Sequence, residues 1–231
     1  MFDDLRWFGL QWQEGPDCGG PFAPYSQSER LHLYRAAFEK LRAIGLIYPC
    51  TCSRQDVLRA LQAPHAVDED PHYPGTCRPK STERPGTGIE TSSPSTLVTR
   101  DPSPPINWRF LVPDGETISF VDGRCGRQQF ISGRDFGDFV VWRHDDTPAY
   151  QLAVVVDDAA MRITEVVRGE DLLNSTARQL LVYRALNLVP PAFYHCPLVT
   201  DTSGTRLAKR HDALSLRTLR SQGAKPESIR A

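Results

Sequence analysis

The chain has 231 residues and a mass of 25.9 kDa, which suits one large domain or two small ones. Apolar residues make up 40%, and no apolar run approaches the roughly 20 residues that a membrane-spanning helix needs, so we expect no membrane span. The 27 Lys and Arg against 28 Asp and Glu give a formal charge of −1, which excludes a strong overall attraction to nucleic acid. Any RNA contact must therefore be local.

The N-terminal segment MFDDLRWFGLQW has two acidic residues before its first basic residue and no uninterrupted apolar core, so it is unlike a secretory signal. We therefore expect a cytoplasmic protein. Its six cysteines are too few for a disulfide scaffold, and a reducing cytoplasm would keep them as thiols.

The first predicted element is an amphipathic helix. Ser26 and Glu29 have the spacing of a capping box, which places the start of the helix there. Gly45 stands where a left-handed C-cap is expected. The apolar positions recur at steps of three and four residues, at Leu31, Tyr34, Phe38, Leu41 and Ile44. A shorter helix is predicted over residues 54–62, beginning after Ser53.

Three cysteines, Cys50, Cys52 and Cys77, lie within one short stretch. Thiolates bind zinc well, and structural zinc sites take four ligands. The fourth ligand could be His65, His72 or Tyr73. The spacing is only moderately indicative, because the usual two-residue gap between paired cysteines is missing, and the alternative is a set of buried thiols that pack as small apolar groups.

Residues 85–105 form a distinct segment in which 15 of 21 residues are Pro, Ser, Thr or Gly. Such a composition buries too little apolar area to offset the entropy of ordering. We expect a mobile surface insertion here.

Beyond this insertion the chain alternates between predicted strands and a helix. β-branched and aromatic residues predict strands at 106–112, 139–143, 152–156 and 163–168, and Ser175 can cap a helix that runs to Leu186. The third and fourth of these runs, LAVVV and ITEVV, suit a sheet that is covered on both faces. The alternation predicts an α/β fold.

Polar residues follow these last two predicted strands. Because the carboxyl ends of strands line the ligand crevice of an open α/β sheet, Asp157, Asp158 and Arg168 are candidate site residues. Arg168 could hold a substrate carboxylate in a bidentate pair. The alternative is a structural salt bridge from Arg168 to a neighbouring acid.

The C-terminal segment carries a local positive charge. From residue 200 to 231 there are seven Lys or Arg and three Asp or Glu, with Arg206, Lys209, Arg210 and His211 close together after a glycine-bearing turn. Such a loop could neutralise the phosphates of a nucleotide or of RNA, and the alternative is a solvated, frayed terminus. The phosphate-binding pattern G-x-x-x-x-G-K-[ST] does not occur in the sequence.

Five segments, taken in this order, form a combination that is far more specific than any one of them. They are DDLRWFGLQWQEGP (3–16), the run from YSQSER to CTCSR (25–54), HYPGTCR (72–78), the run from PAYQLAVVV to YRALNL (148–188) and RLAKR (206–210). Together they resemble the class I glutamyl-tRNA synthetases, and most closely the short glutamyl-Q tRNA(Asp) synthetases of that family. The resemblance covers nearly the whole chain apart from the Pro/Ser/Thr-rich insertion.

The resemblance implies an α/β fold with a Rossmann-type catalytic domain and a small zinc-bearing insertion. It divides the chain into the first part of the catalytic domain (1–47), the zinc-binding insertion with its mobile segment (48–105) and the rest of the catalytic domain (106–231). The family's first strand, with its Arg-Phe-Ala-Pro-Ser-Pro-Thr-Gly motif, and its His-x-Gly-His helix have no counterpart here. We therefore expect an N-terminally incomplete catalytic domain with an unpaired sheet edge.

The resemblance also implies which residues form the site. It maps the family's zinc ligands onto Cys50, Cys52, Tyr73 and Cys77. It maps the glutamate-binding tyrosine onto Tyr150 and the carboxylate-binding arginine onto Arg168. The family's Lys-x-Ser-Lys loop is represented by residues 206–210, in which Arg206 replaces the first lysine, Ala208 replaces the serine, and Lys209 keeps the second lysine. Arg206 and Lys209 would then bind ATP, with Lys209 as the catalytic residue.

The activity that follows from the resemblance is activation of glutamate with ATP and Mg²⁺ and its transfer to tRNA. In the short branch, which the chain length favours, the acceptor is the queuosine base of tRNA(Asp). We expect Zn²⁺ as cofactor, a monomer, and no membrane partner. The alternatives are a tRNA- or partner-binding remnant without catalytic activity and a fragment of a full-length glutamyl-tRNA synthetase.

Overall fold

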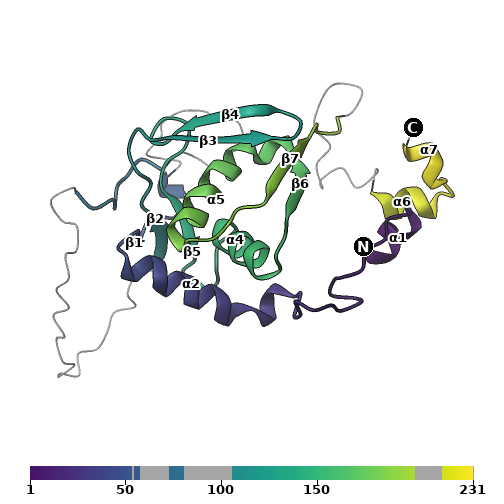
Figure 1. The fold of residues 1–231 in the computed structure, drawn as a ribbon, viewed down its shortest axis with the longest axis horizontal. Coiled ribbons are helices and arrows are strands. Elements are labelled where there is room, and N and C mark those ends of the chain that lie inside the picture. Colours follow the sequence, from purple (N-terminus) through teal and green to yellow (C-terminus); the bar gives the residue numbers. More distant parts are fainter. Residues whose placement is uncertain (54, 58–72, 81–105, 201–214, 231) are drawn as a thin grey trace.

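The computed structural model describes residues 1–53, 55–57, 73–80, 106–200 and 215–230. Its main sheet has the strand order β4-β3-β7-β6 (Figure 1). β3 (Thr117–Asp122) and β4 (Gly126–Ile131) form an antiparallel hairpin, whereas β7 (Ala192–Cys196) runs parallel to both β3 and β6 (Glu165–Gly169). Among the described residues β6 pairs with β7 alone, so no described strand covers its other edge.

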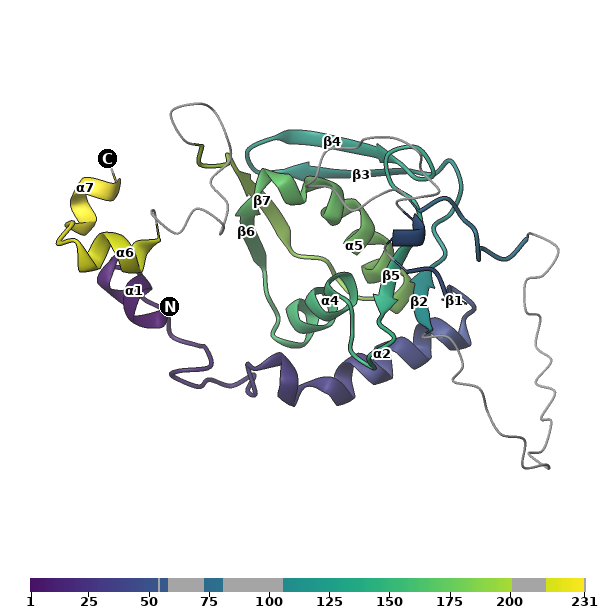
Figure 2. The same ribbon diagram turned by 180° about the vertical axis from the view of Figure 1, so that it is seen from behind.

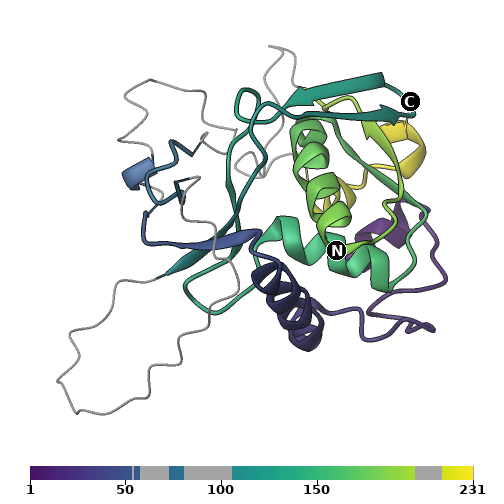
Figure 3. The same cartoon turned by 60° about the vertical axis from the view of Figure 1, so that its left-hand side comes forward.

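A second, antiparallel sheet has the order β1-β2-β5. β1 (Ile47–Cys50) pairs with β2 (Asn107–Phe110), and β2 pairs with β5 (Phe139–Trp142). The predicted strands at 106–112 and 139–143 are thus confirmed with slightly shorter bounds. Figure 3 shows the blue segment after β1 on the side of the molecule away from the yellow C-terminal helices.

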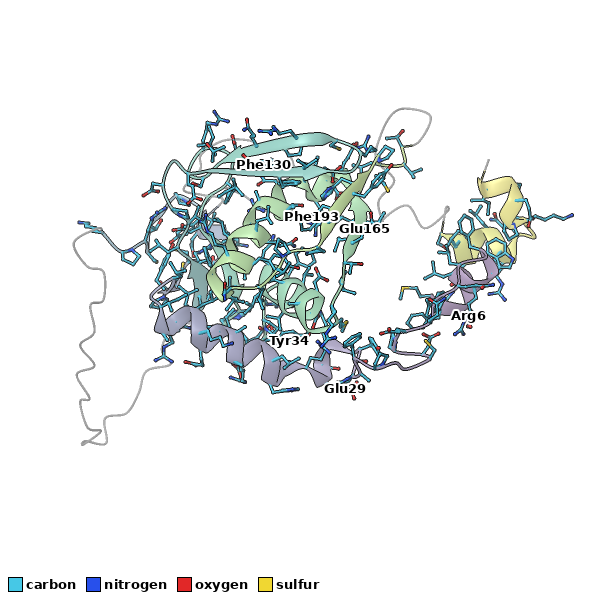
Figure 4. The ribbon with its side chains drawn as sticks, viewed as in Figure 1. Arg6, Glu29, Tyr34, Phe130, Glu165 and Phe193 are labelled. Carbon is cyan, nitrogen blue, oxygen red and sulfur yellow. The ribbon has the colours of Figure 1, made fainter. Side chains whose placement is uncertain are left out.

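Three helices lie in successive layers on one face of the main sheet. α5 (Leu173–Leu186) packs against β3, α4 (Tyr150–Ala160) packs against α5, and α2 (Leu31–Ala43) packs against both (Figure 2). Figure 4 shows the depth of this arrangement, with Phe130 and Phe193 on the sheet and Tyr34 on the most distant helix. The apolar core fills the spaces between these layers, and its most completely buried side chains include Leu41, Phe136, Val141, Leu152, Val155 and Val182.

The N-terminus of α2 differs from the predicted one. Residues Gln27–Glu29 form a short 3-10 helix, the Ser26 side chain makes no capping hydrogen bond, and the α-helix begins at Leu31. The predicted apolar stripe is confirmed except at Ile44, which lies past the end of the helix and is 55% exposed. Gly45 follows with a φ of +69°, as a left-handed C-cap requires.

The prediction of a strand at 152–156 is wrong, because these residues form the middle of α4. Leu152, Ala153, Val155 and Val156 are all buried. β-Branched residues favour strands only through the surfaces they pack against, and here α2, α5 and β5 surround the segment on most sides. An apolar run that is buried all round carries no periodicity with which to tell helix from strand.

The remaining predicted elements are mostly confirmed. The strand at 163–168 corresponds to β6, and the helix 175–186 corresponds to α5, which begins two residues earlier and is not capped by a side chain. Residues 55–57 are helical, and Ser53 and Asp56 form a reciprocal capping pair through their side chains and backbone amides. The rest of the 54–62 prediction and the whole of 85–105 lie outside the described residues.

The two ends of the described chain meet in a small helical group (Figure 1). α1 (Phe2–Trp7) contacts α6 (Leu216–Ser221), and α7 (Pro226–Arg230) follows α6. Arg217 and Arg220 form ion pairs with Asp4 at 3.6 Å and 3.5 Å. None of the described helices is long and apolar enough to cross a lipid bilayer.

Candidate active site and metal-binding cluster

Three cysteine thiols and one phenol converge beyond the end of β1. Cys50 is the last residue of that strand, and Cys52 follows two residues later. Tyr73 and Cys77 belong to the described segment 73–80. The three Sγ atoms lie within 4.8 Å of one another. The Tyr73 hydroxyl lies 3.4 Å from the Cys50 sulfur and 3.6 Å from the Cys52 sulfur, and it accepts a hydrogen bond of 2.7 Å from the Cys77 amide.

This donor set has the dimensions of a tetrahedral zinc site. With Zn–S bonds of about 2.3 Å and Zn–O bonds of about 2.0 Å, a tetrahedron needs S···S separations of about 3.8 Å and S···O separations of about 3.5 Å. The Cys52 and Cys77 sulfurs are 3.6 Å apart. Among the described residues, these three cysteines are the group that could hold a metal ion, and Tyr73 fits the fourth position. His65 and His72, the other candidates, lie outside the described residues.

The surroundings of the cluster favour a thiolate at one position. Burial alone would disfavour the charged form of Cys77, but hydrogen bonds from the Thr51 backbone and from the side chains of Tyr73 and Cys52 lower its pKa to about 7. Burial raises the pKa of Cys52, and burial together with the Cys50 thiol raises the pKa of Tyr73.

Arg109 on β2 contacts this cluster, and it was not predicted from the sequence as a site residue. Its guanidinium carbon lies 3.8 Å from the centroid of the Tyr73 ring, and its Nε donates a hydrogen bond of 3.2 Å to the Cys50 sulfur. Its Nη1 also donates to the backbone oxygen of Asp138. A buried cation so placed offsets the negative charge of thiolates and holds the tyrosine ring in position.

A second cluster forms around Arg168, which lies near the carboxyl end of β6 as predicted. Its Nη1 donates toward the Tyr150 hydroxyl at 3.4 Å, so the tertiary structure brings together the two residues that the resemblance assigned to glutamate. Its Nη2 donates to Thr176 at 2.6 Å and to Gln179 at 2.9 Å, both on α5. No ion pair joins Arg168 to a carboxylate of the described residues, which removes the structural salt bridge considered above.

A histidine supports Arg168 on its inner side. His195 lies directly opposite Arg168 in the parallel pairing of β6 and β7 and is fully buried. The Arg168 Nε donates to the His195 Nε2 at 3.2 Å, and the other ring nitrogen of His195 lies 2.7 Å from the Asp122 carboxylate. Neither His195 nor Asp122 was predicted, because their proximity to Arg168 depends on the pairing of three strands that are distant in the sequence.

A cavity of about 590 Å³ extends from the cysteine cluster to Tyr150, and Arg168 is not among its lining residues. Cys52, Tyr73 and Arg109 line it at the metal-binding end, and Tyr150, Gln151 and Arg178 line it at the start of α4 and along α5. The cavity beside Tyr150 thus has three arginines in its lining, Arg109, Arg143 and Arg178, and Cys52 and Tyr73 are the members of the cysteine cluster that reach it.

Asp157 and Asp158 do not lie at the edge of the sheet, which corrects the expectation for them. Both are on α4, where Asp157 pairs with Arg30 at 2.7 Å and Asp158 accepts a hydrogen bond of 3.0 Å from Tyr183. They were misplaced because the segment before them is a helix and not a strand. Arg206 and Lys209 lie outside the described residues.

The chain is similar in sequence to known tRNA synthetases. The family model described as tRNA synthetases class I (E and Q), catalytic domain, matches residues 1–231. A glutamyl-Q tRNA(Asp) synthetase of Symbiobacterium thermophilum is 50% identical over 98% of this chain, and one of Nitratidesulfovibrio vulgaris is 46% identical over 98%. Glutamate–tRNA ligase 2 of Nitrosococcus oceani is 40% identical over 99% of this chain and 46% of its own length.

The chain spans 66% of the length of the two glutamyl-Q tRNA(Asp) synthetases. Among solved structures, the glutamate-tRNA synthetase of Elizabethkingia anophelis superposes with a TM-score of 0.69 at 28% identity, covering 90% of this chain and 41% of that one. This chain thus has the fold of a class I synthetase catalytic domain, with a partly parallel sheet covered by helices. The chain therefore belongs to the catalytic-domain family of the class I tRNA synthetases for glutamate and glutamine.

Proposed function

We propose that this chain activates glutamate with ATP and transfers it to tRNA, with the queuosine base of tRNA(Asp) as the acceptor. The observation that carries the proposal is the contact of Arg168 with Tyr150, which lines the cavity, in a chain that the family model matches over residues 1–231. The 50% identity to a glutamyl-Q tRNA(Asp) synthetase supports the short branch over a full-length glutamyl-tRNA synthetase.

Arg168 would bind the carboxylate of glutamate, but not as the bidentate fork that the sequence suggested. A guanidinium has five N–H groups. Among the described residues, Nε donates to His195, Nη2 donates to both Thr176 and Gln179, and Nη1 donates to Tyr150. One N–H of Nη1 remains for the substrate, and the Tyr150 hydroxyl supplies a second donor. The substrate carboxylate would therefore accept one charge-assisted hydrogen bond from the Arg168 Nη1 and one from the Tyr150 hydroxyl.

Lys209 would be the catalytic residue, and it would bind ATP together with Arg206. Attack of the glutamate carboxylate on the α-phosphate releases pyrophosphate, and negative charge grows on the phosphate oxygens during this step. A lysine ammonium stabilises that charge as it develops, and Mg²⁺ bound with ATP shares the task. Arg206 keeps a positive charge in place of the first lysine of the family loop, with a planar shape.

Zn²⁺ would be held by Cys50, Cys52, Tyr73 and Cys77. Four protein ligands fill a tetrahedron and leave no open position, so the ion would order residues 48–105 as a separate insertion between 1–47 and 106–231. Described residues of this segment, among them Cys52 and Tyr73, line the same cavity as Tyr150. Three thiols kept for a metal suit a reducing compartment such as the cytoplasm. Its partners would be glutamate, ATP and tRNA, with the protein acting as a monomer.

The test is glutamate-dependent ATP–pyrophosphate exchange by this chain, followed by transfer of labelled glutamate to tRNA(Asp) with and without queuosine. Exchange and transfer only to queuosine-containing tRNA(Asp) are the expected results. Transfer to the 3′ end of tRNA(Glu) would instead identify a glutamyl-tRNA synthetase. Binding of tRNA without exchange would favour the non-catalytic alternative.

A further inference from the structure

The carboxylate of Asp122 is buried, and every contact made by it is with a donor. Its Oδ1 accepts hydrogen bonds from the backbone amides of Arg124 at 3.0 Å and Cys125 at 2.8 Å. Its Oδ2 accepts from the backbone amide of His195 at 3.1 Å and lies 2.7 Å from the Nδ1 of the same residue. A carboxylate surrounded by donors in this way stays ionised and is an acceptor only.

The Asp122 carboxylate determines which nitrogen of His195 carries the proton. Since Asp122 can only accept, the Nδ1 of His195 must be the donor, and the Nε2 of the neutral ring keeps its lone pair. The Arg168 Nε, which can only donate, lies 3.2 Å from that lone pair. The reverse tautomer would direct an N–H group at the N–H of the guanidinium.

The fixed ring in turn fixes the guanidinium plane. The hydrogen bond from Nε to His195 and the hydrogen bonds from Nη2 to Thr176 and Gln179 hold two of the three nitrogens. Nη1 is the nitrogen directed toward Tyr150. Because His195 is fully buried, it contacts Arg168 from the protein side and leaves the opposite side to the substrate.

We propose that His195 and Asp122 are positioning residues for glutamate: Asp122 holds His195 in the Nδ1–H tautomer, and the Nε2 of His195 holds Arg168 with its Nη1 toward the substrate carboxylate. This inference rests on the proposed role of Arg168 in glutamate binding. Neither residue touches the substrate, so their effect passes through Arg168.

Two substitutions of His195 separate the contact of its Nδ1 with Asp122 from the contacts of its Nε2 with Arg168 and with the Thr176 hydroxyl, which lies 3.2 Å away. The amide of His195→Gln occupies the place of Nε2 and can still accept from Arg168, whereas the amide of His195→Asn occupies the place of Nδ1 and keeps only the contact with Asp122. We expect His195→Asn to weaken L-glutamate binding by roughly tenfold to a hundredfold, the range for losing a hydrogen bond to a charged group. His195→Gln should stay within a few fold of the wild type, and ATP affinity should not change in either variant.

The tautomer has its own test, because Asp122→Asn allows the side-chain amide to donate to Nδ1 and moves the ring proton to Nε2. This variant should weaken L-glutamate binding as strongly as His195→Asn. In the His195→Gln background the same change should have little further effect, since no tautomer remains to be set. Glu116→Gln is the control: Glu116 directly precedes β3, the strand that ends with Asp122, and its substitution removes an ion pair with Arg184 of α5 and should leave glutamate affinity unchanged.

The position of the guanidinium is measured directly by the ¹⁵N NMR signal of the Arg168 Nε–H, assigned by its loss in Arg168→Lys. Slow exchange of this proton in the wild type and in His195→Gln, with fast exchange in His195→Asn, is the expected result. Equal effects of His195→Gln and His195→Asn on the signal and on glutamate affinity would overturn the proposal, as would a wild-type histidine spectrum with the proton on Nε2. If the wild type binds no L-glutamate while the signal still follows this pattern, the proposed function fails and the positioning of Arg168 stands.

Discussion

Arg30 and Asp157 lie 127 residues apart and form a buried ion pair, with 2.7 Å between Nε and Oδ1. The same carboxylate accepts hydrogen bonds from the Tyr34 hydroxyl at 2.8 Å and from Gln27 at 2.9 Å. Burial and the adjacent Asp157 raise the pKa of Tyr34, which therefore stays a neutral donor. The pair fastens the N-terminal end of α2 to the C-terminal part of α4, and so fixes the helix that begins with Tyr150.

Arg30→Met should destabilise the protein by about 3–5 kcal/mol, because it leaves the Asp157 charge buried without its cation. The measurement is the free energy of unfolding from urea denaturation. Arg42→Met is the control: Arg42 pairs with Glu39 on the exposed side of α2, and its loss should cost no more than about 1 kcal/mol. Equal losses from both variants would show that burial of the pair is not what matters.

Cys52→Ser should abolish stoichiometric zinc binding, because a serine hydroxyl does not replace a thiolate in this donor set. Atomic absorption of the purified protein gives the zinc content directly. Cys18→Ser removes an exposed thiol whose one hydrogen bond joins it to the neighbouring Gly19 carbonyl, and it should retain all of the zinc. Wild-type protein without zinc after purification in zinc-supplemented medium would contradict the site.

Tyr73→Phe should weaken zinc binding without abolishing it. The substitution removes the oxygen but keeps the ring that stacks on Arg109. Three thiolates with a water in the fourth position still make a zinc site, as in catalytic zinc centres. Competition with a chelator should therefore remove zinc faster from Tyr73→Phe than from the wild type, whereas Cys52→Ser should contain no stoichiometric zinc to remove. Indistinguishable rates in the wild type and Tyr73→Phe would exclude Tyr73 as a ligand.

Asp122 should contribute to stability in a pH-dependent way. Burial alone would raise its pKa, but hydrogen bonds from the Cys125 amide and the His195 ring, with others, hold it well below its usual range. A carboxyl whose pKa is lower in the folded than in the unfolded protein stabilises the fold above the unfolded pKa of about 3.9, and this contribution is lost as the pH falls below it. The difference in unfolding free energy between the wild type and Asp122→Asn should thus be constant near neutral pH and shrink below about pH 4. A difference that does not change with pH would contradict the shift.

Lys209→Ala should reduce glutamate-dependent ATP–pyrophosphate exchange by orders of magnitude, since its ammonium would no longer stabilise the charge that develops at the reacting phosphate. Lys225→Ala, which removes a lysine between α6 and α7, is the matched control and should leave exchange unchanged. Near-normal exchange in Lys209→Ala would exclude the catalytic role.

Local pattern was enough for much of the fold. The apolar stripe of α2, the Gly45 cap, the strands around residues 107 and 139 and the helix that ends at Leu186 follow from periodicity and residue type. Local pattern failed at 152–156, where a β-branched run became a helix because its neighbours bury it on most sides. Local pattern also did not predict β3 and β4, the two strands of the hairpin, whose outward faces are largely polar.

The sequence by itself determined the candidate groups: the three cysteines with their short spacing, and Tyr150 and Arg168 through the resemblance to a family. Tertiary structure alone decided which groups act together. The pairing of β6 with β7 places His195 against Arg168, and the pairing of β3 with β7 brings Asp122 to His195. Side chains on strands that are distant in the sequence meet only when the register between those strands is set, and register comes from packing of the whole sheet against α5. For that reason the candidate binding residues could be predicted from the sequence, and the residues proposed to orient them could not.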